Sequence, residues 1–366
     1  MVDTKTGIQD LTGLVRPSVA ASQPYRVPAY PGISVKVNQN ESPFDLPEKL
    51  KRALVERFLE QPWNRYPDEF GDDLRETVAR RVGWTGNGVL LGNGSNELAQ
   101  FLGFTLIEPG TPVVLLDPMF ALYSKVVGLN NGVEHPVRCE RDFSTDPAKI
   151  IETAQRVGAR LTIVASPNNP TGRAIPVDQL ERVAFEIPGL LLIDEAYHEF
   201  VDGPPATSLL ASHPNVLVLR TLSKAVGIAG LRFGYLLAHP LLITEMLKAR
   251  LPFMINRLTS IVADYLMTHP DVINERVDVL KTERQGLYDA LSGMEGVEAI
   301  PSDTNFVIFR TPRPANEIEE GLAERGVLVR DVSGYRALDR FVRVNAGLPT
   351  ENKAFLSALN DVLFSG

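Results

Sequence analysis

Short apolar runs alternate with amphipathic stretches along the middle of the chain. The clearest runs are Val89–Leu91, Val113–Leu116, Leu161–Ala165 and Leu190–Ile193. Each is too short to cross a membrane and is typical of a buried parallel strand. Helical patterns separate these runs from about residue 46 to residue 250, which predicts an α/β fold with a mainly parallel sheet between helices.

The last third of the chain has a different pattern. A long helical stretch is predicted from about Leu258 to Leu291. Strands are predicted after it, near Phe306–Phe309, Val327–Val329 and Phe341–Val344. The first 45 residues are rich in proline and have no clear period. We therefore predict an N-terminal arm (1–45), a large domain (46–257), and an interdomain helix with a small α+β domain (258–366).

The segment from Thr221 to Arg232 places a lysine among hydroxyls, glycines and a cation. Lys224 follows Ser223 directly, and Arg232 comes eight residues later. A lysine attacks a carbonyl when desolvation or a nearby cation lowers its pKa, and Arg232 could supply that cation. Arg232, Thr221 and Ser223 could also bind a phosphate dianion. The pattern indicates a site for an aldehyde cofactor with a phosphate group, although Ser223-Lys224 alone also fits a solvated loop lysine.

Two polar positions follow predicted strands. Asp194 stands at the carboxyl end of its strand, where ligands collect in open α/β sheets. A carboxylate there would keep a ring nitrogen protonated, which makes pyridoxal phosphate an electron sink; a helix N-cap is the structural alternative. Asn169 lies in a rigid Pro- and Gly-containing turn and could donate to a phenolate oxygen, with Tyr197 as a second donor. Asparagine before proline is also a common turn former.

The ordered set Asn169-Pro170-Thr171-Gly172, Asp194-Glu195-Ala196-Tyr197 and Ser223-Lys224 followed by Arg232 makes the resemblance specific. The chain resembles the fold-type I pyridoxal-phosphate aminotransferases, and within them it is similar to the histidinol-phosphate aminotransferases, from about Leu14 to the C-terminus. The resemblance implies a large domain with a mainly parallel seven-stranded sheet and a small α+β domain.

The resemblance also implies roles around pyridoxal 5'-phosphate. Lys224 would form the Schiff base with the cofactor and move the proton, and Asp194 would pair with the pyridinium nitrogen. Asn169 and Tyr197 would bind the phenolate oxygen. The remaining implied contacts are with the phosphate and with the ring of the cofactor. The phosphate would be bound by the side chains of Thr221, Ser223 and Arg232 and by backbone donors of Gly94, Ser95 and Asn96. Phe120 would stack on the ring. A core phenylalanine and a plain Gly-Asn turn are the structural alternatives for the last two sets.

Other implied roles concern the partner subunit and the substrate. Tyr66 matches a tyrosine that reaches the cofactor phosphate of the partner subunit, which implies a homodimer with shared active sites and an arm that packs on the partner. Arg343, on a predicted strand, would clamp the substrate carboxylate. Arg330 and Tyr25 match residues that face the substrate phosphate, and Asn40 borders the same pocket.

Three positions depart from the family pattern at the border of this pocket. They are Ser42 and Met254, where asparagine is usual, and Val226, where phenylalanine is frequent. They leave the transamination chemistry intact and bear on which substrate is used.

Composition adds bounds to this interpretation. The 366 residues carry a net charge of -8, which argues against a nucleic-acid surface. The single cysteine, Cys139, suits a reducing cytoplasm, and no apolar stretch predicts a signal or a membrane span. The histidines show no metal-ligand spacing.

The sequence therefore predicts a histidinol-phosphate aminotransferase of histidine biosynthesis that works by a ping-pong mechanism, with glutamate and 2-oxoglutarate as the second pair of substrates. Three alternatives remain: an aromatic amino-acid aminotransferase, a pyridoxal-phosphate decarboxylase of a phosphorylated amino acid, and a cofactor-binding regulatory module without turnover.

Overall fold

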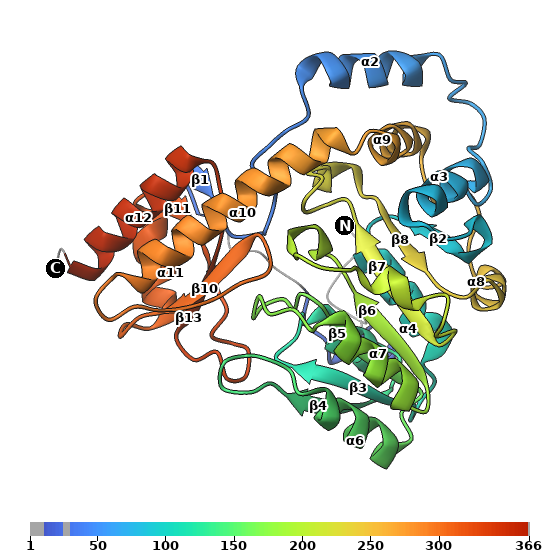
Figure 1. The fold of residues 1–366 in the computed structure, drawn as a ribbon, viewed down its shortest axis with the longest axis horizontal. Helices are drawn as coiled ribbons and strands as arrows, with labels where there is room; N and C mark the ends of the chain where they lie inside the picture. Colours follow the sequence, from blue (N-terminus) through green and yellow to red (C-terminus); the bar gives the residue numbers. More distant parts are fainter. Residues whose placement is uncertain (1–10, 25–29, 365–366) are drawn as a thin grey trace, which may run out of the picture.

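The computed structural model describes residues 11–24 and 30–364 (Figure 1). Its largest sheet has seven strands in the order β2-β8-β7-β6-β5-β3-β4. These strands are β2 (Val89–Gly92), β3 (Pro112–Asp117), β4 (Val133–Arg138), β5 (Leu161–Ala165), β6 (Leu190–Asp194), β7 (Val216–Thr221) and β8 (Gly234–Leu237). Strand β8 runs antiparallel to its neighbours β2 and β7, and the other pairings of this sheet are parallel. The predicted seven-stranded, mainly parallel sheet is confirmed.

Helices cover this sheet, which explains the continuous apolar runs of its strands. Strands β5 and β7 are buried along their whole length, as expected when both faces are covered. The helices of this part are α2 (Glu48–Leu59), α3 (Asp72–Val82), α4 (Ser95–Leu106), α5 (Leu122–Leu129), α6 (Pro147–Val157), α7 (Val177–Glu186), α8 (Pro240–Leu247) and α9 (Arg257–Thr268). Short 3-10 turns lie at Gly86–Gly88, His198–Phe200, Ala206–Leu209 and Ala229–Leu231.

A second, smaller part carries its own hydrophobic core (Figure 1). Its four-stranded antiparallel sheet has the order β12-β13-β10-β9, and β1 pairs with β11 beside it. The elements are β1 (Val35–Lys36), β9 (Glu298–Ile300), β10 (Phe306–Arg310), β11 (Val327–Leu328), β12 (Arg330–Asp331), β13 (Phe341–Asn345), α10 (Asp271–Ser292), α11 (Ala315–Glu324) and α12 (Pro349–Phe364). The predicted small α+β region is thus confirmed, whereas the predicted domain boundaries stay a prediction.

The single long helix predicted from Leu258 to Leu291 is wrong. The structure has two helices, α9 and α10, with His269 and Pro270 between them. Proline disfavours the helical conformation of the residue before it, and His269 accordingly has φ -127° and ψ 69°. The helical period continues on both sides of Pro270, which is why the pattern alone suggested one helix.

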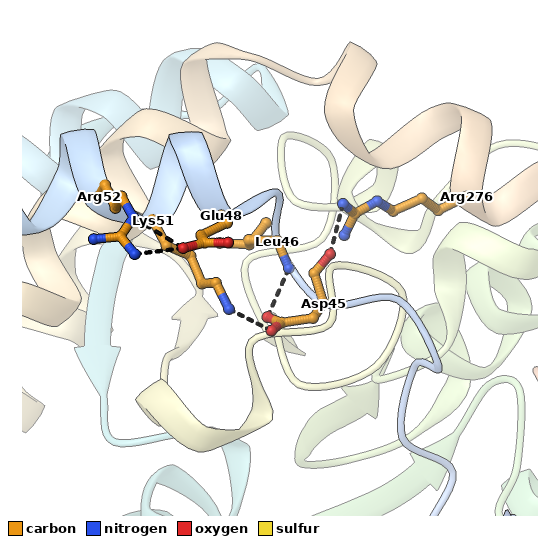
Figure 2. A network of polar contacts seen from close by, with 6 residues as sticks. All are labelled: Asp45, Leu46, Glu48, Lys51, Arg52 and Arg276. Atoms are coloured by element: carbon orange, nitrogen blue, oxygen red, sulfur yellow. Dashed lines mark hydrogen bonds and ion pairs between the residues drawn. The ribbon is translucent and has the colours of Figure 1, made fainter.

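The N-terminal segment joins the two parts of the molecule. After a 3-10 turn (Leu11–Leu14) and the short helix α1 (Pro17–Ala20), it forms β1 in the smaller part and then crosses to α2. Figure 2 shows how the crossing ends at Asp45. The Asp45 carboxylate accepts hydrogen bonds from Leu46 N and from Lys51 Nζ. The backbone carbonyl of Asp45 accepts a hydrogen bond from Arg276 of α10 at 3.0 Å. The start of α2 is therefore tied to the helix that opens the smaller part.

No helix in residues 11–24 and 30–364 is long and apolar enough to cross a membrane.

The smaller core should depend on Phe309. This side chain is fully buried and lies edge-on to Phe355, with ring centroids 5.9 Å apart. Phe309→Ala should lower the free energy of unfolding by about 3 to 5 kcal/mol, because it removes the ring and leaves a cavity. Urea unfolding of the cofactor-free protein measures this. The control is Phe185→Ala on α7, where the ring is 81 % exposed and the change should stay within about 0.5 kcal/mol. Equal losses in the two variants would contradict the assignment of Phe309 to a core.

Candidate active site

The chemistry-bearing residues lie on loops at one edge of the large sheet. Strands β2, β3, β5, β6 and β7 all run in the same direction, since β8 alone is reversed between β2 and β7. Their carboxyl ends therefore meet at the same edge, which is where open α/β sheets bind ligands. The loops after them carry the candidate residues between positions 93 and 96, 118 and 123, 166 and 172, 195 and 197, and 222 and 232.

Lys224 occupies the loop after β7 and is partly buried. Its Nζ donates to the carbonyl of Gln39 at 2.9 Å. Burial lowers the pKa of this amine to about 8, and the field of Arg343 lowers it further than that of Arg232. The sequence analysis expected Arg232 to be the cation that lowers the pKa of Lys224. Arg343 makes the larger contribution, and the sequence analysis missed it. With a pKa of about 8, about a tenth of the amine is neutral at pH 7.

Asp194 ends β6 and is buried. Its Oδ2 accepts a hydrogen bond from Tyr123 Oη at 2.5 Å, and its Oδ1 accepts from Ala196 N at 3.0 Å. Burial raises the pKa of this carboxyl to about 6, and both hydrogen bonds oppose the rise. The bond to the residue two positions on is a turn contact and not an α-helix N-cap, because the next element is a 3-10 turn that begins at His198.

Asn169 and Tyr197 face the same region through two well-defined contacts. Arg343 donates to Asn169 Oδ1 at 2.6 Å, so the amide nitrogen of Asn169 points away from the guanidinium. Asn40 Nδ2 donates to Tyr197 Oη at 2.8 Å, which leaves the phenolic hydrogen of Tyr197 for another acceptor. Burial raises the pKa of Tyr197 to about 12, so the hydroxyl keeps its proton.

A second polar group gathers at the start of α4. Arg232 Nη1 lies 3.4 Å from Ser223 Oγ, and Ser223 Oγ lies 3.0 Å from Thr221 Oγ1. Gly94 has φ 82°, and a Cβ on it would come within 2.5 Å of the Arg232 guanidinium. Only glycine leaves room there for the arginine beside the first N–H groups of the helix, at Ser95 and Asn96. Hydroxyls, a guanidinium and a helix N-terminus are the partners that a phosphate group needs.

Two further candidates lie apart from these contacts. Phe120 is partly buried and packs against the large core in the loop after β3. Tyr66 is 76 % exposed and stacks on Phe253 with ring centroids 4.5 Å apart. Nothing among the described contacts joins the Tyr66 side chain to Lys224 or Arg232 of its own chain.

The two candidate substrate arginines are direct neighbours. Arg330 on β12 pairs in register with Arg343 on β13, so the two side chains start on the same face of the antiparallel sheet. Arg343 also donates to the carbonyl of Asn38 at 2.9 Å and lies over the Phe306 ring at 5.3 Å. Tyr25, the other expected pocket residue, lies outside the described residues.

The sequence analysis missed three contributors. Tyr123 bonds to Asp194, and the backbone carbonyls of Asn38 and Gln39 accept from Arg343 and Lys224. Tyr123 stands three positions after Phe120 in the same loop-to-helix segment. This proximity to a candidate residue is the one feature of the sequence that could have pointed to Tyr123. Backbone carbonyls give no signal in a sequence. Within the described ranges, no group of three or more His, Cys, Asp or Glu side chains could hold a metal ion.

Comparison with known proteins identifies the family of this chain. The family model of "Aminotransferase class I and II" matches residues 33–359. The chain belongs to the class I and II aminotransferases. It is therefore a pyridoxal-phosphate-dependent aminotransferase, as predicted from its sequence, and its cofactor is pyridoxal 5'-phosphate.

Individual relatives of this aminotransferase cover nearly its whole length. It is 39 % identical over 353 residues to a histidinol-phosphate aminotransferase of Chlorobium phaeovibrioides, with 96 % of this chain and 97 % of that protein covered. It is also 39 % identical to one of Chlorobium luteolum, with 90 % and 92 % covered. Among solved structures, it is similar to the histidinol-phosphate aminotransferase of Sinorhizobium meliloti in complex with pyridoxal-5'-phosphate. The TM-score is 0.83 and the identity is 27 %, with 91 % of this chain and 92 % of that chain covered.

Replacing Arg343 should raise the pKa of Lys224. The guanidinium disfavours the charged amine, so in Arg343→Gln the amine should lose its proton at a higher pH than in the wild type, where the pKa is about 8. Only the neutral amine reacts with acetic anhydride. The rate of acetylation at Lys224, followed by mass spectrometry on cofactor-free protein over a pH series, gives the midpoint. Arg310→Gln on β10 is the control and should leave the midpoint unchanged; the same midpoint in all three proteins would refute the effect of Arg343.

Proposed function

We propose that this aminotransferase transfers an amino group from glutamate to imidazole acetol phosphate, giving 2-oxoglutarate and L-histidinol phosphate, in histidine biosynthesis. The observation that carries the proposal is the register of Arg330 opposite Arg343 beside the Lys224 amine. The curated relatives that match over nearly the whole chain bear the name of this activity.

The contacts at the sheet edge fit the cofactor. Bound pyridoxal phosphate accepts the amino group and stabilises negative charge on the reacting carbon. Lys224 would carry its covalent attachment, because its lowered pKa makes the amine nucleophilic. The buried Asp194 carboxylate would pair with the ring nitrogen and favour its protonated form. The free donors of Asn169 and Tyr197 would both point to the phenolate oxygen.

The group at the start of α4 would bind the cofactor phosphate. Arg232, Ser223 and Thr221 supply side-chain donors, and Ser95 and Asn96 supply backbone N–H groups at the positive end of the helix dipole. Phe120 would cover one face of the ring from the loop after β3. Asn40 would hold Tyr197 in place through its 2.8 Å hydrogen bond and border the substrate.

The paired arginines would select anionic substrates. Like charges directly opposite each other on a sheet destabilise it, so Arg330 and Arg343 favour a bound anion between or beside them. In this proposal Arg343 binds the α-carboxylate of glutamate and Arg330 faces the phosphate of the histidine-pathway substrate. Tyr25 would complete this pocket.

Lys224 would then act as the acid-base group. When it is not attached to the cofactor, the Lys224 amine would take the proton from the substrate Cα and deliver it to the C4' carbon of the cofactor. In the structure its hydrogen-bond acceptor is Gln39 O. Glutamate would leave as 2-oxoglutarate before imidazole acetol phosphate binds. This order predicts ping-pong kinetics.

The proposal includes a homodimer with shared active sites in the cytoplasm. The exposed Tyr66, stacked on Phe253, is a candidate for the partner's cofactor phosphate, and the arm before β1 would pack on the partner as well. One cysteine, Cys139, is compatible with a reducing compartment.

The alternatives make different demands on the pocket. An aromatic aminotransferase would use the same machinery without needing Arg330. A decarboxylase of a phosphorylated amino acid would release carbon dioxide and need no oxo-acid. A regulatory module without turnover does not need a lysine whose pKa is tuned to about 8, so we place it last.

Arg330 should decide the choice of substrate. The protein in its amino form is mixed with imidazole acetol phosphate or with phenylpyruvate, and the return of the cofactor absorbance is followed. Wild type should react much faster with the phosphorylated substrate. Arg330→Gln should slow that reaction on the order of 10²-fold, since a charge-assisted hydrogen bond is lost, with little effect on phenylpyruvate. Arg340→Gln, a surface arginine of the neighbouring loop, is the control. A wild-type preference for phenylpyruvate would assign the protein to the aromatic aminotransferases. Release of carbon dioxide from a phosphorylated amino acid would assign it to the decarboxylases.

Mixing two impaired variants should restore activity. Lys224→Ala should abolish turnover, and Tyr66→Ala should weaken cofactor binding. If each site takes Lys224 from one subunit and Tyr66 from the other, a mixed dimer contains one intact site. Unfolding the two variants together and refolding them should therefore raise activity above that of either variant treated alone. Lys224→Ala mixed with itself is the control, and no gain from the two-variant mixture would argue against shared sites.

A further inference from the structure

Tyr123 reaches Asp194 from a distant strand. It lies at the start of α5, after β3, whereas Asp194 ends β6, and β5 separates these two strands in the sheet. The ring is 2 % exposed and belongs to the large core. Its Oη nevertheless lies 2.5 Å from Asp194 Oδ2, at the edge where the cofactor binds.

The direction of this hydrogen bond is fixed. Burial raises the pKa of Tyr123 well above its usual value, and the charge of Asp194 raises it further. The hydroxyl therefore keeps its proton and donates to the carboxylate. Ala196 N donates to the other oxygen at 3.0 Å. Two donors on two oxygens fix the plane of the carboxylate and leave a lone pair on each oxygen for a further partner.

The charge of Asp194 depends on these donors. Burial alone favours the neutral acid and raises the pKa of the carboxyl to about 6, while the Tyr123 hydroxyl and the Ala196 N–H act against it. Among the charged groups around Asp194, Glu195 raises the pKa and Lys224 lowers it. A carboxylate that took up a proton could not stabilise a protonated ring nitrogen.

We propose that Tyr123 is a positioning residue of the transamination: its hydroxyl keeps the Asp194 carboxylate ionised and oriented toward the cofactor ring nitrogen. The inference rests on the proposed role of Asp194 and does not depend on which oxo-acid is the natural substrate. A tyrosine that served only to fill the core would need no hydroxyl at this point.

The test compares Tyr123→Phe with Tyr235→Phe. Both tyrosines are buried in the large core. Tyr235 lies on β8, two strands from Asp194, and its hydroxyl bonds to Arg220, so the pair separates loss of the hydroxyl on Asp194 from loss of a buried hydroxyl with another partner. With glutamate as donor, Tyr123→Phe should lower kcat by about tenfold to a hundredfold, the size of one hydrogen bond to a charged group. KM for glutamate should change little, because Tyr123 is buried and its hydroxyl bonds to Asp194. Tyr235→Phe should keep wild-type kcat.

Two readouts go beyond the size of kcat at one pH. The acidic limb of the pH profile of kcat should move to higher pH in Tyr123→Phe, since Asp194 then takes up a proton more readily. The nitrogen-15 shift of labelled cofactor bound to the protein should report less protonation of the ring nitrogen than in wild type at the same pH. Unchanged values for both would overturn the proposal, and the melting temperature of each variant shows whether it folds.

A double-mutant cycle separates this inference from the proposed function. The effect of Tyr123→Phe on cofactor dissociation should largely vanish in an Asp194→Asn background, because the hydroxyl acts through that carboxylate. Additive losses would mean that Tyr123 acts by packing and would overturn the inference. Wild-type activity in Asp194→Asn itself would instead remove the proposed role of Asp194.

Discussion

The cost of burying charge is the constraint on which the active site depends. Charged groups stand at the carboxyl edge of a sheet whose strands are covered on both faces, where water cannot solvate them fully. Each is stabilised by a specific partner. Glu195 and Arg220 form a buried ion pair at 2.8 Å next to Asp194, which in turn accepts from Tyr123 and Ala196. Burial outweighs these partners at two groups, since it raises the pKa of Asp194 and lowers that of Lys224.

The crossing segment between β1 and α2 connects this constraint to the arrangement of the two parts. Its carbonyls at Asn38 and Gln39 accept from Arg343 of the smaller sheet and from Lys224 of the larger part. Asn40 adds a bond to Tyr197, and Asp45 ends the crossing at Arg276. A shift of the smaller part would therefore move acceptors that contact the lysine directly. The segment sets distances within the site through its backbone carbonyls and through the Asn40 side chain.

The sequence allowed prediction of the elements that depend on a local pattern. It did not allow prediction of the contacts between segments that are distant along the chain. The strands ending at Gly92 and Asp194 were recognisable because they are buried on both faces and read as continuous apolar runs. The break at Pro270 was overlooked because the helical period resumes after it. The bond from Tyr123 to Asp194 joins residues 71 positions apart across an intervening strand, and no local pattern encodes that. Likewise, motif matching named Arg330 and Arg343 separately, and only the register of β12 with β13 makes them neighbours.

In the proposed function, Arg343 links substrate binding to the acid-base chemistry. Its field lowers the pKa of the Lys224 amine, which favours the neutral, nucleophilic form before substrate arrives. Under the proposed role, the substrate carboxylate then neutralises much of that field. Once the anion is bound, the same amine becomes a stronger base, at the stage when it has to take a proton from the substrate Cα. The coupling is reciprocal, because a protonated Lys224 near Arg343 also favours binding of the anion. Under the proposed roles, one arginine on β13 would thus serve both the attachment of the cofactor and the later proton transfer.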